Sequence, residues 1–144
     1  LKEKLRQESV NCEEVTHVVI THGHIDHCGN VNLFPRAQFY MARDIAGNCE
    51  YSELRENSCE LFPNVELRVL DGHTDCDLVV IVHGTKLGNV AIAGDIFENE
   101  DDEEEYIKYS QYPDKQRVSR QKLNEISDFI IPGHGVMFKV SKQK

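Results

Sequence analysis

Four potential metal ligands are crowded into one short stretch of the chain. In His22-Gly23-His24-Ile25-Asp26-His27, three imidazoles and one carboxylate fall within six residues. Nitrogen and oxygen donors in this combination suit zinc. Alternate residues of an extended segment share one side, so His22 and His24 can bind one ion while Asp26 and His27 turn towards a second. A lone histidine is more often structural, but this density of ligands favours a metal site.

Three later segments place the same kinds of side chain in loops. They are Gly72-His73-Thr74, Ala93-Gly94-Asp95 and Pro132-Gly133-His134-Gly135. A Gly-His or Gly-Asp pair alone carries almost no information, whereas all of these motifs in this order are highly specific. His73, Asp95 and His134 are therefore further candidate ligands.

The elements that must position these residues alternate between strands and short helices. The β-branched run at 15–21 predicts a buried strand that ends where the histidine cluster begins. A short helix at 29–34, a strand at 37–42 and one or two short helices within 43–63 are expected next. The remaining predictions are strands at 65–70, 77–83, 89–93 and 128–131 and a helix at 114–127. Each later ligand then lies in a loop that follows a strand.

Composition describes an ordinary globular domain. The chain has 144 residues, of which 40% are hydrophobic and 28% charged, and we expect one domain over residues 1–144. Its 16 basic and 25 acidic residues give a net charge of -9, which repels polyanions at long range, so a nucleic acid would have to be held by local contacts. Five cysteines without a CxxC pair predict free thiols in a reducing, intracellular compartment. No membrane segment is expected.

The ordered motifs resemble those of the metallo-β-lactamase fold superfamily. This resemblance implies an α/β fold of the αββα sandwich type, in which helices flank two packed sheets. The superfamily's opening strands normally precede the histidine cluster, so the chain is expected to lack them and to need the missing N-terminal segment of the same protein. The resemblance also implies two zinc ions per subunit, held by seven residues: His22, His24 and His73 on the first ion, Asp26, His27 and His134 on the second, and Asp95 on both.

The implied chemistry is hydrolysis. Two zinc ions lower the pKa of a shared water from about 16 to about 7 and make hydroxide available at neutral pH. Asp26 is the expected catalytic residue, because it can orient this hydroxide and pass its proton to the leaving group. No serine or cysteine nucleophile is needed, and Cys28 and Cys76 are expected to be small buried thiols.

Residues 16–24, 29–35 and 93–98 resemble one branch of the superfamily more closely. Members of that branch are regarded as homodimeric, intracellular two-zinc proteins with endoribonuclease activity on histone precursor messenger RNA. The resemblance implies an RNA substrate, a homodimer and a cytoplasmic location, with the nucleus as a second one.

Other functions remain open. A glyoxalase-II-like thioesterase uses the same seven ligands but adds a helical C-terminal region. Zinc β-lactamases commonly have cysteine where Asp95 stands, and a persulfide dioxygenase would bind iron through part of the ligand set. A non-catalytic metal-binding scaffold would keep the ligands without turnover.

The remaining polar residues receive mostly structural interpretations. His17 and His83 are expected to form ordinary hydrogen bonds. Asp75 or Asp77 is a candidate to orient the His73 imidazole. The acidic run at 98–105 predicts a solvated loop, and the basic helix face is expected to be solvent-exposed, with contact to a phosphate backbone as the alternative. That face consists of Lys115, Arg117, Arg120 and Lys122.

Overall fold

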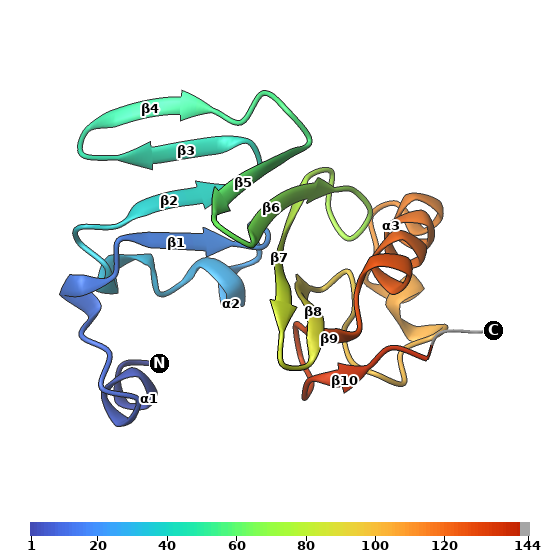
Figure 1. The fold of residues 1–144 in the computed structure, drawn as a ribbon. Coiled ribbons are helices and arrows are strands. Elements are labelled where there is room, and N and C mark those ends of the chain that lie inside the picture. Colours follow the sequence, from blue (N-terminus) through green and yellow to red (C-terminus); the bar gives the residue numbers. More distant parts are fainter. Residues whose placement is uncertain (142–144) are drawn as a thin grey trace. The chain divides into compact units, whose positions relative to one another are not determined.

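The computed structural model describes residues 1–141, which form two compact units that divide between Arg55 and Glu56. Each unit contains one mixed sheet and a few helices (Figure 1). The predicted α/β class is therefore confirmed. Whether the units fold as one domain stays a prediction.

The first unit has a four-stranded sheet in the order β1-β2-β3-β4. The parallel pair β1 (His17–Ile20) and β2 (Gln38–Met41) is followed by the antiparallel strands β3 (Asp44–Gly47) and β4 (Glu50–Glu53). Both predicted strands at the start of the chain are thus present. The helical segments of this unit are α1 (Lys2–Gln7), η1 (Cys12–Glu14), α2 (Ile25–Cys28) and η2 (Val31–Leu33).

The helices expected within residues 43–63 are wrong, because this segment forms strands. Asn48 and Cys49, with φ of 52° and 62°, make a two-residue turn that joins β3 to β4. Positive φ at both central residues matches the right-handed twist of a hairpin. The rest of the segment enters the second sheet as β5 (Ser58–Phe62).

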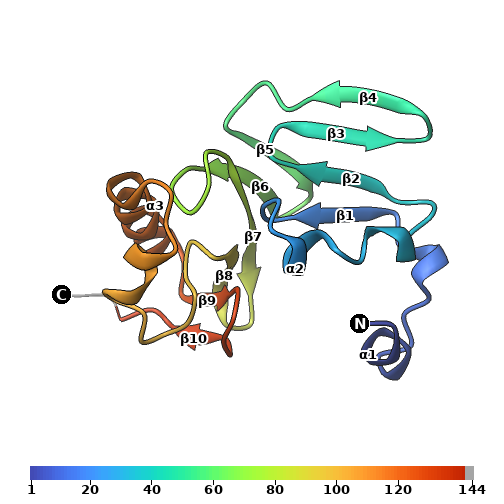
Figure 2. The same cartoon turned by 180° about the vertical axis from the view of Figure 1, so that it is seen from behind.

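The second unit contains a six-stranded sheet in the order β10-β9-β8-β7-β6-β5 (Figure 2). Strands β6 (Val65–Leu70), β7 (Asp77–Thr85) and β8 (Gly88–Gly94) are antiparallel neighbours, and β7 and β8 flank the predicted Gly-containing turn. After β8 the chain passes through η3 (Glu105–Lys108) and α3 (Pro113–Ile126) to reach β9 (Phe129–Pro132), which pairs parallel with β8. The short strand β10 (Phe138–Lys139) was not predicted.

This topology brings three loops to one end of the second sheet. Because β8 and β9 are parallel, with Gly94 opposite Pro132, the loops that follow them start side by side. The antiparallel strand β7 begins at that same end, since Val80 pairs with Ile92. The loop before β7 therefore joins the other two.

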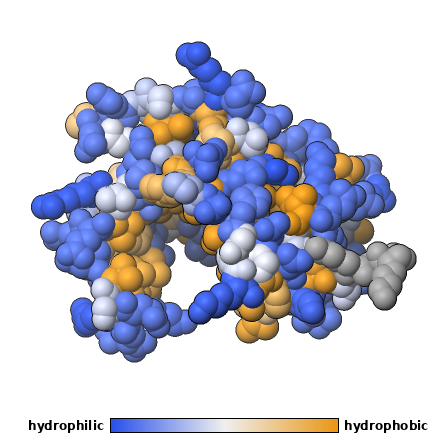
Figure 3. Space-filling model, in the orientation of Figure 1, coloured by the Kyte–Doolittle hydropathy of each residue, from blue (hydrophilic) through white to orange (hydrophobic). Residues whose placement is uncertain are grey.

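The core of the second unit lies between its sheet and α3. It includes Val79, Ile81 and Ala91 from the sheet and Leu123 from α3, all fully buried. Burial of each Val, Ile or Leu side chain in this set contributes roughly 1.5–3 kcal/mol. On the face drawn in Figure 3, polar residues predominate and apolar residues form separate patches. Among residues 1–141, no helix has the length and apolar character needed to cross a membrane.

Candidate metal centre

The histidine cluster of the first unit begins at His22, two residues after the end of β1. His22 is buried, and the Oγ1 of Thr21 lies 3.2 Å from its Nδ1. The Nε2 of His22 lies 2.9 Å from the Nδ1 of His24, and the His22 and His27 rings are 4.2 Å apart between centroids. The facing nitrogens of His22 and His24 are placed as in two ligands of a shared cation.

Asp26 and His27 lie in the single helical turn α2. The Oδ2 of Asp26 is 3.5 Å from the Nε2 of His27. The His27 side chain is largely buried, whereas that of Asp26 is 56% exposed. Asp26 can therefore reach both His27 and solvent, as a carboxylate that exchanges protons with water must.

The second unit gathers the three later candidates at the sheet end described above. Asp95 follows β8, His134 follows β9, and His73 lies in the loop before β7. The Oδ2 of Asp95 is 3.4 Å from the Nε2 of His73 and also 3.4 Å from the Nε2 of His134. Asp95 is only 5% exposed and His73 only 2%. One buried carboxylate oxygen thus lies between two imidazole nitrogens.

Sequence reasoning missed Glu98, which joins this cluster. Its Oε1 lies 3.8 Å from the Nδ1 of His73, and its Oε2 lies 4.0 Å from the Nε2 of His134. Ligand atoms of Asp95, Glu98 and His134 lie within 4.8 Å of one another and could hold a metal ion. The expectation of a solvated loop was wrong at Glu98 and at Asp102, which is fully buried. The apolar pair before Glu98 was the available signal that the segment turns back to the core.

Helix α3 and the turn before it hold two of the ligand loops. The backbone N–H groups of Gln111 and Tyr112 donate to the carbonyls of His73 and Gly72, respectively. The fully buried side chain of Gln116 donates through Nε2 to the carbonyl oxygens of Asp95 and Ile96, at 2.8 and 3.2 Å. The helix and the turn before it therefore fix the backbone on both sides of the cluster.

Arg120 departs from the exposed basic face predicted for this helix. Lys115, Arg117 and Lys122 are exposed, but the Arg120 side chain is largely buried and forms a bidentate ion pair with Asp102. The two bonds are 2.5 Å, from Nη2 to Oδ1, and 2.9 Å, from Nη1 to Oδ2. Asp102 Oδ2 also accepts the backbone N–H of Glu98 at 2.7 Å. This ion pair therefore anchors the segment that carries Glu98.

Asp77 supports the His73 loop from the start of β7. Its carboxylate accepts the backbone N–H of Thr74 at 2.9 Å and the Thr74 hydroxyl at 2.7 Å. Asp75 is exposed. The carboxylate that faces the Nδ1 of His73 is instead that of Glu98. Burial raises the pKa of Asp77 to about 6, against the opposing effect of the Thr74 hydrogen bonds.

This raised pKa gives a testable pH dependence. Native Asp77 binds its proton more tightly than the unfolded chain does, so its contribution to stability falls as pH rises from about 4 to about 6. In metal-free protein, we expect Asp77→Asn to gain on the order of 2 kcal/mol relative to the wild type over this interval. Urea unfolding of both proteins across the interval measures the difference. A difference that does not change with pH would contradict the assignment.

The other polar residues have structural contacts. The Nδ1 of His17 lies 2.9 Å from the Thr16 hydroxyl, and the Nε2 of His83 lies 3.1 Å from Glu66 Oε2. All five cysteines are free, and Cys28 and Cys76 are partly rather than fully buried.

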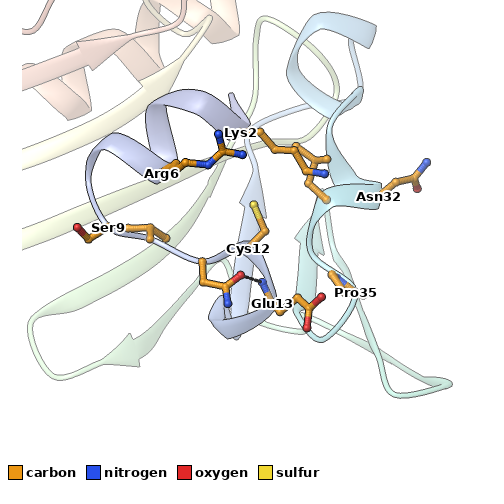
Figure 4. Close-up of a pocket in the computed structure, with 10 residues that line it drawn as sticks. Lys2, Arg6, Ser9, Cys12, Glu13, Asn32 and Pro35 are labelled. Atoms are coloured by element: carbon orange, nitrogen blue, oxygen red, sulfur yellow. Dashed lines mark hydrogen bonds between the residues drawn. The ribbon is translucent and has the colours of Figure 1, made fainter.

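A cavity of about 560 Å³ lies near α1 and η2, lined in part by Lys2 and Arg6 (Figure 4). Within the described part of the chain, no predicted ligand lines it.

Comparison with known proteins agrees with this arrangement. Residues 1–43 match the model of the metallo-beta-lactamase superfamily. Metallo-beta-lactamase domain-containing protein 1 of Xenopus laevis is 39% identical over 147 residues, covering 99% of this chain and 63% of that protein. The Homo sapiens protein of that name is 38% identical over 135 residues, covering 90% of this chain and 51% of the relative. The chain thus spans about half to two-thirds of the length of these relatives.

Solved structures extend the likeness to the fold. A Thermotoga maritima protein named as a metallo-beta-lactamase has a TM-score of 0.70 at 20% identity, over 96% of this chain and 75% of its own. AidC, a dizinc quorum-quenching lactonase, has a TM-score of 0.69 at 12% identity, over 99% of this chain and 70% of its own. At these identities the likeness concerns the fold alone.

Proposed function

We propose that this chain, which belongs to the metallo-beta-lactamase superfamily, forms the metal-binding part of a two-zinc hydrolase that cleaves RNA phosphodiester bonds. The observation that carries the proposal is the buried Asp95 carboxylate lying 3.4 Å from two imidazole nitrogens. Because the chain covers only part of its relatives, this activity is proposed for the whole protein.

The donor set fits zinc. The candidate ligands offer imidazole nitrogens and carboxylate oxygens, which zinc accepts together. We propose the division implied by the motif order, with Asp95 shared between the ions. By that order, His22, His24 and His73 would hold the first ion, and Asp26, His27 and His134 the second. Zinc bound in this way lowers the pKa of water to about 7 and supplies hydroxide at neutral pH.

The protein's own side chains then have separate tasks. Asp26 is proposed to hold and transfer the proton, and its partial exposure next to His27 suits that role. Burial of His73 and Asp95 excludes water from the inner side of the cluster, which strengthens electrostatic interactions there. The hydrogen bonds from α3 keep the ligand backbones in place before any cation arrives.

The choice of RNA rests on the narrower resemblance carried by residues 16–24, 29–35 and 93–98. The net charge of -9 opposes long-range attraction of a polyanion, so local cations must hold the substrate. Lys115 is suited to this, because its exposed ammonium lies 3.5 Å from Asp71, two residues before His73. The same resemblance supports a homodimer that acts in the cytoplasm or nucleus.

A substrate panel with metal analysis tests the proposal. Protein of known zinc and iron content is incubated with histone precursor RNA, a thioester, an acyl-homoserine lactone and a β-lactam. We expect RNA cleavage that stops when a chelator removes the metal and returns when zinc is added. If the RNA stays intact while the thioester or the lactone is hydrolysed, the protein is a thioesterase or a lactonase instead. Iron without zinc would favour a persulfide dioxygenase, and two zinc ions without any turnover would favour a scaffold.

A further inference from the structure

We infer that Glu98 is a positioning residue of the proposed metal centre, where its carboxylate accepts the Nδ1–H of His73 and directs the Nε2 of that ring to the metal. The inference rests on the proposed function, and it concerns a residue outside the seven predicted ligands. It begins with the two nitrogens of His73, which face different carboxylates. Nε2 lies 3.4 Å from Asp95 Oδ2, and Nδ1 lies 3.8 Å from Glu98 Oε1.

The chemistry of imidazole indicates which nitrogen of His73 faces the metal and which one carries the proton. The nitrogen that binds a cation carries no proton, so the other nitrogen carries it and needs an acceptor. The Nε2 atoms of His73 and His134 both lie 3.4 Å from the same oxygen of Asp95, which identifies the metal-facing side. Nδ1 of His73 is then the protonated nitrogen, and Glu98 is the carboxylate next to it. Partners of this kind fix the tautomer and ring orientation of metal-binding histidines.

The backbone of Glu98 is held on both sides. Its N–H donates to Asp102 Oδ2 at 2.7 Å, and its carbonyl accepts the N–H of His134 at 2.9 Å. Asp102 is itself fixed by Arg120, which also donates to the carbonyl of Ile96 at 3.0 Å. Because the backbone of Glu98 is fixed, the torsions of its side chain are what would have to shorten the 3.8 Å separation to a charge-assisted hydrogen bond of about 2.8 Å.

Zinc affinity tests this role without reference to any substrate. We expect Glu98→Ala to bind the same number of zinc ions as the wild type, but about 10- to 100-fold more weakly, as measured by competition with a chromophoric chelator. Glu98→Gln should recover part of the loss, because its amide oxygen can still accept the Nδ1–H. Glu100→Ala is the matched control, since it removes an exposed glutamate from the same acidic segment and should leave affinity unchanged.

A second measurement separates positioning from a merely structural effect. Nitrogen chemical shifts of the zinc-loaded protein should show His73 protonated at Nδ1. The population of this tautomer should fall in Glu98→Ala and recover in Glu98→Gln. Wild-type affinity in Glu98→Ala would overturn the inference, and so would the loss of one zinc ion, because Glu98 would then be a direct ligand. If Glu98→Ala does not fold, Glu98→Gln alone decides. Unchanged zinc affinity in that variant, together with a His73 ring protonated at Nε2, would overturn the role. Failure of the wild type to bind zinc would instead refute the proposed function.

Discussion

Asp95→Ala is expected to lose at least one zinc ion and to lower hydrolysis by about 10³-fold or more. Asp95 is the carboxylate whose one oxygen lies within 3.4 Å of both His73 and His134. Removing it takes the negative charge from the centre of a buried cluster and leaves two imidazoles to face a divalent cation without it. Metal content per protein and kcat/KM on the substrate identified by the panel measure the two effects.

Two variants sharpen this prediction. Asp95→Asn preserves the shape of the side chain, so comparison with Asp95→Ala separates the loss of charge from the loss of volume. Asp101→Ala removes an exposed acidic residue from the nearby loop and should retain both zinc and activity. Full metal content and normal turnover in Asp95→Ala would remove this residue from the centre.

Asp102→Ala should have the largest effect on folding and lower the free energy of unfolding by about 3–5 kcal/mol. The Asp102 side chain is 0% exposed, and its two oxygens bind Arg120 and the backbone of Glu98. The guanidinium of Arg120 also lies 4.0 Å from the centre of the Phe97 ring. Without its carboxylate partner, this cation stays within an apolar environment, which is costly. The midpoint and slope of urea unfolding measure the change.

A double-mutant cycle identifies the ion pair as the cause. Asp102→Ala and Arg120→Ala should each destabilise strongly, and the double variant should lose less than the sum of the two. Asp101→Ala serves again as a control and should stay within about 0.5 kcal/mol of the wild type. Additive losses would show that the two side chains act independently of each other.

Local patterns predicted the elements whose signals lie within a few residues. The strands predicted at 15–21, 65–70 and 77–83 formed as β1, β6 and β7, and α3 starts and ends within one residue of its prediction. The hairpin of β3 and β4 was missed because its turn uses Asn48 and Cys49 without a glycine, the usual indicator of positive φ. Cys49 is an uncommon residue in that conformation, so of the two turn residues Asn48 alone indicated the turn.

The candidate site also contains residues that local sequence patterns identify and residues that they do not. The ligand types at 22–27 are visible in the sequence because they are adjacent. Glu98 and Asp102 were misjudged because an acidic run usually indicates solvent, and their burial depends on Arg120, which follows much later in the chain. Gln116 carried no signal at all, since nothing local marks a glutamine that will hydrogen-bond the carbonyl of a distant aspartate. Such contacts exist only once tertiary structure has formed.

The parallel pairing of β8 and β9 makes the spacing of two candidate ligands independent of the chain segment that connects them. Asp95 and His134 leave neighbouring strands whose register sets Gly94 opposite Pro132. Their spacing is thus independent of the length of the polypeptide that connects them. Exposed positions in that connection, such as those at 103–105, can gain, lose or exchange residues during evolution while the coordination geometry persists. Changes at those positions therefore need not disturb the placement of Asp95 and His134.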